Sequence, residues 1–64
     1  MAEIEDFEQF RGKDVNVVDS EIVRLWDGEV VFLPDNTIFT ADYQPQRIRI
    51  FYDSNMLITD ILIG

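Results

Sequence analysis

The side chains that could do chemistry in this sequence are almost all carboxylates. The chain has thirteen Asp and Glu residues, five Lys and Arg residues, and neither histidine nor cysteine. It therefore cannot build the common nucleophile–base pairs, thiolate zinc sites or a disulfide framework. Asp19, Glu21, Asp53 and Asp60 lack metal-loop spacing such as that of an EF-hand, and we expect them on solvated faces. We predict no metal, no cofactor and no catalytic residue, and we do not expect an enzyme.

Length and net charge narrow the class of protein further. A chain of 64 residues has room for one small domain, and we assign 1–64 to it. The formal net charge of −8 repels nucleic-acid phosphate and anionic lipid, so we expect neither partner and interpret the charge as favouring solubility. No apolar run approaches a membrane span, and the acidic N-terminus is the reverse of a basic signal-peptide start. We expect a monomer and leave the compartment open.

One helical face and three apolar stretches predict an α/β (α+β) domain with a small mixed or parallel sheet. Asp14 is a good helix N-cap, and apolar residues then recur at helical spacing, which predicts a helix over about 14–26. Its face toward the sheet comprises Val15, Val18, Ile22, Leu25 and Trp26. A β-branched run predicts a buried strand over 29–33. The pattern over residues 1–11 could form a short helical turn, but no strong cap fixes it, and we expect the segment to be peripheral.

The clearest strand pattern is the alternation over 47–53. One face carries Ile48, Ile50 and Tyr52, and the other carries Arg47, Arg49 and Phe51. We expect Ile48 and Ile50 to face the helix. A turn at 53–55 then leads to a final strand over 57–63.

The connection over 34–46 between the first two strands is unusually long for so small a domain. Its composition is not that of a disordered linker, since Thr37, Ile38, Phe39, Thr40 and Tyr43 favour β structure and glycine is absent. An extended, exposed segment of this kind has the shape that a protease cleft accepts. The alternative is an ordinary crossover between parallel strands, which must be long because a hairpin cannot make it.

The sequence of this region resembles a known family. Leu33-Pro34, Thr40-Ala41-Asp42 and Arg47-Ile48-Arg49 follow one another in the order found in the potato inhibitor I family of serine-protease inhibitors. The segment Thr40 to Arg47 is also similar to the signature of a sister family, the small bacterial and fungal inhibitors of elastase and subtilisin. Gly12-Lys13-Asp14-Val15 resembles the start of the family's helix, so the resemblance covers roughly 12–64.

The resemblance implies a substrate-like inhibitor with a long exposed reactive loop. The implied protease-binding residues are Thr37, Ile38, Phe39, Thr40, Ala41, Asp42 and Tyr43, and the implied scissile bond is Ala41–Asp42. Arg47 and Arg49 would support the loop through Asp42, and Gly64 would anchor an arginine. Ala41 is too small to fill a trypsin or chymotrypsin pocket, so the implied partner is a subtilisin-like or elastase-like serine protease. The family includes extracellular and vacuolar proteins.

A second function from a different class stays open. The same fold could serve as a non-inhibitory interaction module that binds a partner through its acidic surface or a sheet edge. An enzyme is a distant third. The loop discriminates between the first two, because an inhibitor needs 40–42 rigid and tethered by both arginines.

Overall fold

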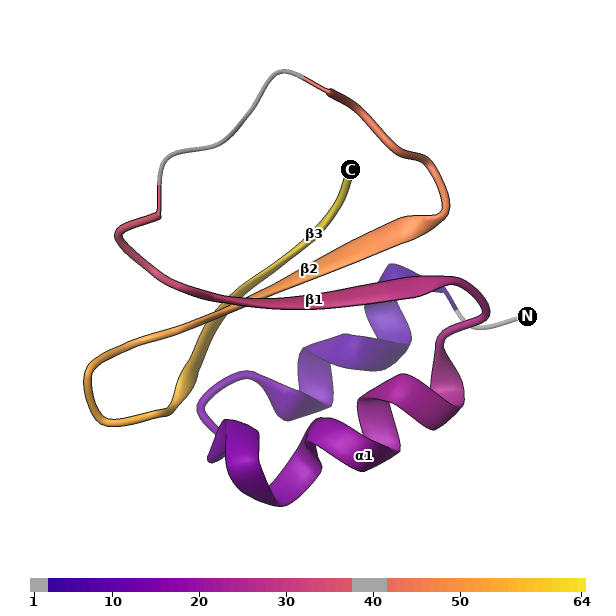
Figure 1. Ribbon diagram of the computed structural model, residues 1–64. Helices are drawn as coiled ribbons and strands as arrows, with labels where there is room; N and C mark the ends of the chain where they lie inside the picture. The colour runs from indigo at the N-terminus through magenta and orange to yellow at the C-terminus, as the bar shows by residue number, and fades with distance from the viewer. Residues whose placement is uncertain (1–2, 38–41) are drawn as a thin grey trace.

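Two short helices cover one face of a three-stranded sheet. In the computed structural model, which describes residues 3–37 and 42–64, the elements are η1 (Ile4–Phe10), α1 (Val15–Leu25), β1 (Glu29–Pro34), β2 (Arg47–Tyr52) and β3 (Ile58–Ile63). The helices lie below the sheet in Figure 1, and the stretch 42–46 lies on the opposite side. The expected α+β architecture with a small mixed sheet is confirmed, but two helices pack on the sheet where the sequence pattern predicted one.

The sheet has the order β1-β2-β3, with β2 in the centre. β1 runs parallel to β2, with Glu29 opposite Arg47 and Pro34 opposite Tyr52. β3 runs antiparallel to β2, with Ile63 opposite Ile48. The parallel pair requires a connection that returns the chain along the whole length of β1. Residues 35–46, called the connecting loop below, make that return.

β1 differs from the prediction of a buried strand ended by Pro34. Its four inner residues are only half-buried, because β1 is an edge strand and pairs on one side alone. Pro34 belongs to the strand as its last residue. Proline is tolerated in an edge strand because its missing N–H costs no ladder hydrogen bond there.

Helix α1 begins and ends close to the predicted bounds. The Asp14 carboxylate caps it by accepting a hydrogen bond from the Asn16 N–H at 2.9 Å. Val15, Val18 and Ile22 are buried as expected. The prediction for Leu25 is wrong, since this last helical residue is 41% exposed. The chain turns into an extended conformation at Trp26, and the Trp26 side chain packs against the core.

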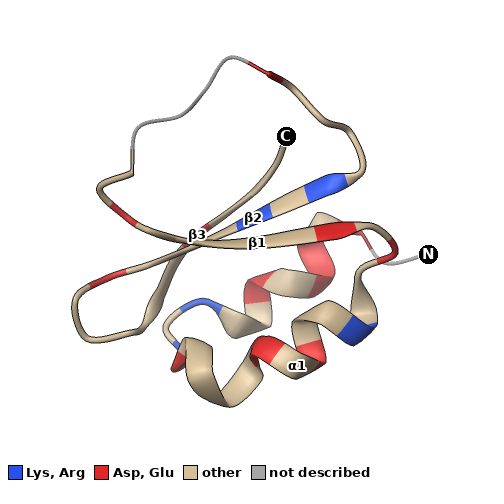
Figure 2. Cartoon of the chain, in the orientation of Figure 1, with Lys and Arg blue, Asp and Glu red and all other residues tan. Residues whose placement is uncertain are grey.

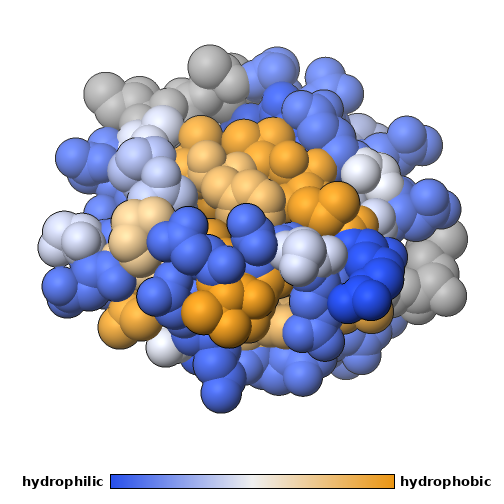
Figure 3. Space-filling view, turned by 60° about the horizontal axis from the view of Figure 1, so that its bottom comes forward, coloured by the Kyte–Doolittle hydropathy of each residue, from blue (hydrophilic) through white to orange (hydrophobic). Residues whose placement is uncertain are grey.

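The apolar core joins both helices to the sheet. Ile48 and Ile50 are completely buried, as predicted from the alternation of β2. The buried core cluster comprises Phe7, Phe10, Val15, Val18, Ile22, Ile48, Ile50, Ile58 and Ile61. Viewed from the helix side, apolar surface remains visible among hydrophilic side chains (Figure 3). Two short helices therefore leave part of the apolar surface in contact with solvent.

The prediction of a peripheral N-terminal segment, made for residues 1–11, is wrong for the described residues 3–11. Phe7 and Phe10 are buried members of the core, because the 3₁₀ helix η1 brings residues three apart onto one face. The Asp6 carboxylate accepts a hydrogen bond from the Glu3 N–H at 2.7 Å and fixes the first turn. The sequence offered only this weak local cap, whereas burial of two phenylalanines stabilises the segment through tertiary packing.

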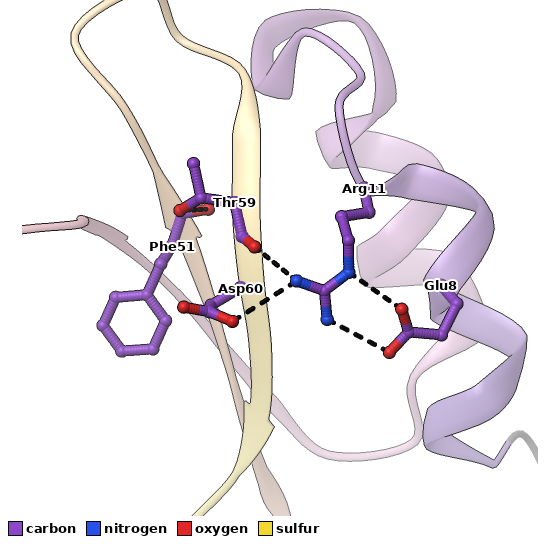
Figure 4. Close-up of polar contacts among 5 residues, drawn as sticks. All are labelled: Glu8, Arg11, Phe51, Thr59 and Asp60. Atoms are coloured by element: carbon purple, nitrogen blue, oxygen red, sulfur yellow. Dashed lines mark hydrogen bonds and ion pairs between the residues drawn. The ribbon is translucent and has the colours of Figure 1, made fainter.

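Arg11 fastens the end of η1 to β3. Its guanidinium pairs with Glu8 at 2.8 Å and donates to the Thr59 carbonyl and to the Asp60 carboxylate (Figure 4). The hydrogen bond from Arg11 lowers the pKa of Glu8 below its ordinary value of 4.5. We call Glu8, Arg11, Thr59 and Asp60 the Arg11 cluster.

Candidate functional site

The face of β2 away from the helices carries two arginines. Arg47 and Arg49 form the basic segments of β2 in Figure 2, whereas acidic residues are spread over both helices. Arg49 and Phe51 are buried on this strand but are not members of the core cluster. Side chains alternate along a strand, so Arg47, Arg49 and Phe51 share the face opposite Ile48 and Ile50. The structure thus places both arginines away from the helix face, as the alternation predicted.

Arg47 links the connecting loop to the end of β3. Its Nε donates to the Gly64 carbonyl at 2.7 Å, and its Nη2 donates to the Asp42 carbonyl at 2.8 Å. Its Nη1 lies 3.5 Å from the Asp42 carboxylate. The backbone adds a hydrogen bond from the Gly64 N–H to the Arg47 carbonyl at 2.9 Å. One planar guanidinium, on a side chain that is only 14% exposed, therefore holds two segments that lie 22 residues apart (64 − 42) in the chain.

Asp42 lies between both arginines. Nη2 of Arg49 lies 3.9 Å from one carboxylate oxygen of Asp42, and Nη1 of Arg47 lies 3.5 Å from the other. The Arg49 side chain is 10% exposed, whereas the Asp42 side chain is 53% exposed. Two sheltered cations thus hold one exposed anion at the surface. We call Asp42, Arg47, Arg49 and Gly64 the Arg47 cluster.

Backbone hydrogen bonds fix both ends of the connecting loop. At the β1 end, the Asp35 N–H donates to the Tyr52 carbonyl at 2.7 Å and the Thr37 N–H donates to the Pro34 carbonyl at 3.0 Å. At the β2 end, the Arg47 N–H donates to the Gln44 carbonyl at 3.0 Å. Thr37 is half-buried, and residues 42–46 between these fixed ends are exposed.

Tyr43 projects from the loop beside the C-terminal glycine. It is largely exposed, and its ring lies so close to Gly64 that an added Cβ there would be 3.2 Å from Cδ1 of Tyr43. Glycine therefore allows the ring to approach the end of β3. Tyr43 and Gly64 thus lie next to one another beside the Arg47 cluster.

Four of the predicted site residues lie outside the described part of the chain. These are Ile38, Phe39, Thr40 and Ala41. The predicted scissile bond Ala41–Asp42 therefore also lies outside the described residues, because one of its two residues does. Of the remaining predicted residues, the structure brings Asp42, Arg47, Arg49 and Gly64 together, with Tyr43 beside them. Thr37 lies at the other end of the loop.

Trp26 and Gln46 also contact this region, although the sequence did not single them out. The Trp26 indole Nε1 donates to the Gln46 carbonyl at 3.0 Å, which joins the end of α1 to the end of the connecting loop. Trp26 was predicted only as a core residue, because its position on the apolar helix face gives no sign of a polar partner twenty residues away.

Two further kinds of feature, a metal-binding cluster and a membrane-spanning helix, are absent from the described residues. Within 3–37 and 42–64, no three acidic side chains gather in a way that would hold a metal ion. Neither helix in these ranges has the length and hydropathy needed to span a bilayer. Comparisons of the chain with models of protein families and with curated proteins found no match.

Proposed function

We propose that the protein inhibits a serine protease by presenting the connecting loop, 35–46, as a substrate-like reactive loop with Ala41–Asp42 as the scissile bond. One observation carries this proposal. Arg47 holds Asp42 through both its carbonyl and its carboxylate, while the same guanidinium is sheltered and bound to Gly64. A crossover that served only to connect two strands would not need its exposed residue held by two cations from the sheet below.

The tether would act on the step that separates an inhibitor from a substrate. Attack of the protease serine on the Ala41 carbonyl breaks the Ala41–Asp42 bond, forms an acyl-enzyme at Ala41 and leaves a free amine on Asp42. With Asp42 held by Arg47 and Arg49, that amine stays beside the ester and can reform the peptide bond. The residues before the bond are attached to the enzyme as the acyl group, and those after it are held to the sheet by the arginines. Hydrolysis by water would be slow because the retained amine reforms the peptide bond.

Affinity would come from order already present in the free loop. Fixing a backbone residue costs about 1–2 kcal/mol of conformational entropy, which a flexible peptide must supply on binding. The hydrogen bonds at both loop ends and the Arg47 cluster meet part of this cost before the protease arrives. No disulfide is needed, and the chain contains no cysteine.

The small side chain of Ala41 favours subtilisin-like and elastase-like targets. An alanine leaves a trypsin or chymotrypsin pocket largely empty and brings no charge for trypsin. Ile38, three residues earlier, supplies an apolar side chain of the kind that subtilisins accept.

Titration of subtilisin, pancreatic elastase, chymotrypsin and trypsin with the full chain tests the proposal. We expect tight inhibition of the first two and weak inhibition of the others. Ala41→Leu should improve chymotrypsin inhibition, and Ala41→Arg should shift the preference to trypsin, because each new side chain suits that pocket. Rapid digestion without inhibition of any of the four proteases would contradict the proposal. An unchanged order of preference in both variants would show that Ala41 is not the primary contact.

A further inference from the structure

The β2 end of the connecting loop has a hydrogen bond that the sheet alone does not explain. The Gln46 carbonyl accepts from the Glu29 N–H at 3.0 Å and also from the Trp26 indole at 3.0 Å. The first bond continues the β1–β2 ladder, since Glu29 pairs with Arg47 in the parallel register. The second bond comes from outside the sheet, from Trp26, the C-cap residue that follows α1.

The indole that makes this bond is anchored in the core. The Trp26 ring packs edge-on against Phe7, with ring centroids 5.7 Å apart and planes at 73°. Phe7 is completely buried in the cluster that both helices share with the sheet. The Gln46 carbonyl is thus held both by the neighbouring strand and, through Trp26, by the apolar core.

Gly28 makes room for this arrangement. A Cβ added at this position would lie 2.2 Å from the Gln46 carbonyl oxygen and 3.0 Å from Trp26 Nε1. The first distance is too short for any side chain and the second would be a tight contact, so the close approach of the turn after α1 to the loop end depends on glycine at 28.

The fixed carbonyl precedes the residue that supports the loop. Gln46 shares its peptide bond with Arg47, whose guanidinium holds Asp42 and Gly64. The planar guanidinium of an arginine can donate to two carbonyls at once only if the backbone of that arginine is correctly placed. Displacement of the Gln46–Arg47 peptide would therefore misdirect the whole Arg47 cluster.

We propose that Trp26 is a positioning residue for the connecting loop, acting through the Gln46 carbonyl on Arg47. The inference deepens the proposed inhibitory function and rests on it for its biological meaning. The physical claim concerns the free protein alone: removal of the indole N–H loosens the β2 end of the loop and spares the β1 end.

Trp26→Phe tests this claim, because phenylalanine keeps an aromatic ring against Phe7 and lacks the donor. Amide hydrogen exchange should be measured in the free protein at the N–H groups of Arg47 and Gly64, which lie at the β2 end. The N–H of Asp35, bonded to Tyr52 at the β1 end, is the internal control. A neutral hydrogen bond is worth about two- to tenfold in an opening equilibrium, so exchange at Arg47 and Gly64 should accelerate by about that factor relative to Asp35.

Gly28→Ala provides an independent test of the same contact. It keeps the indole, but its Cβ would collide with the Gln46 carbonyl oxygen that accepts from the indole, so it should loosen the same two amides. Unchanged relative exchange at Arg47 and Gly64 in both variants would overturn the inference. Equal acceleration at Asp35 would also overturn it, because the effect would then be a loss of global stability.

Incubation with subtilisin separates this inference from the proposed function. If wild-type protein inhibits, Trp26→Phe should be cleaved between residues 41 and 42 about two- to tenfold faster, in proportion to its exchange. If wild-type protein does not inhibit, the proposed function fails, and the exchange ratios still decide the role of Trp26.

Discussion

The two faces of β2 differ in the side chains they carry: one is apolar and the other carries two arginines. Toward the helices, Ile48 and Ile50 are completely buried among apolar side chains. Toward the connecting loop, Arg47 and Arg49 extend sheltered guanidinium groups to an exposed aspartate and a backbone carbonyl. A chain of 64 residues has enough apolar side chains for one core, and that core lies on the helix side. Order on the loop side depends on charge-assisted hydrogen bonds from Arg47 together with the backbone hydrogen bonds at both loop ends.

This difference separates stability from loop order. Apolar burial on the helix face contributes to the free energy of unfolding of the whole domain. Hydrogen bonds on the loop face restrain a segment that can open while the domain stays folded. Substitutions on one strand, one or two residues apart, should therefore have effects of different kinds.

The largest effect is expected on the helix face. Ile48→Ala removes a completely buried side chain and should lower the free energy of unfolding by about 2–5 kcal/mol, which is a large part of a small domain's stability. Urea denaturation measures this loss. Ile63→Ala, at the half-buried register partner of Ile48 in β3, is the matched control and should cost less. If both variants lost the same unfolding free energy, the idea that the central strand β2 contributes most to stability would be contradicted.

Arg47→Ala should have the second largest effect and a different character. It removes donors to Gly64 and Asp42 from a side chain that is 14% exposed, and we expect a loss of about 1–3 kcal/mol in unfolding free energy. If the proposed function holds, cleavage between residues 41 and 42 by subtilisin should accelerate at least about tenfold, the equivalent of 1.4 kcal/mol. Residual protease activity and intact mass over time measure this.

Two further variants show whether charge or geometry matters at position 47. Arg47→Lys keeps the charge but cannot donate to two carbonyls in one plane, so it should resemble Arg47→Ala in the cleavage assay. Arg24→Ala removes a charge from the exposed side of α1 and should behave as wild type in both assays. Full persistence of inhibition in Arg47→Lys would show that a positive charge alone is sufficient.

The sequence predicted the elements that follow a simple period. Alternation over β2 separated Ile48 and Ile50 from Arg47 and Arg49, and Asp14 marked the start of α1. It did not predict the burial of Phe7, because η1 has little helix propensity of its own and is stabilised by packing. It did not predict the exposure of Leu25, because the helix ends there and the chain turns.

The candidate site, like the fold, could be predicted from the sequence only in part. The face on which the arginines lie followed from strand alternation, and their pairing with Asp42 followed from a resemblance in sequence. The bond between Trp26 and Gln46 could not be predicted, since it depends on where the end of α1 meets the start of β2 in space. The role of Gly28 was equally unpredictable, since only the structure shows that an added side chain there would collide with the Gln46 carbonyl.

A smaller effect is expected from Arg49 through Asp42. In a double-mutant cycle, the coupling of Asp42→Asn with Arg47→Ala should exceed its coupling with Arg49→Ala, because the contact to Arg49 is longer, at 3.9 Å against 3.5 Å. Asp42 is 53% exposed, so we expect couplings of about 0.2–1 kcal/mol in unfolding free energy. If the proposed function holds, Arg49→Ala should inhibit subtilisin temporarily and then be cleaved. If the variant inhibited subtilisin for as long as wild type does, Arg49 would not contribute to holding Asp42.

The smallest effect is expected at the Arg11 cluster, which lies on the helix side and joins η1 to β3. The hydrogen bond from Arg11 lowers the pKa of Glu8, so the folded state favours the ionised carboxyl more than the unfolded state does. The contribution of Glu8 to stability is therefore fully present above its ordinary pKa of 4.5 and is lost as the pH falls through the lowered value.

Unfolding of wild type and Glu8→Gln from pH 7 down to pH 3 measures this contribution. The variant should be slightly less stable at pH 7, and the two curves should converge in acid, because protonation removes the same charge that the substitution removes. Glu5→Gln, in the same helix, controls for the change in net charge. Exchange at the Arg47 and Gly64 amides should be the same in wild type and Glu8→Gln at pH 7, once corrected for global stability. A selective change at those two amides would mean that the helix side and the loop side of the sheet are coupled, and the separation of domain stability from loop order would then fail.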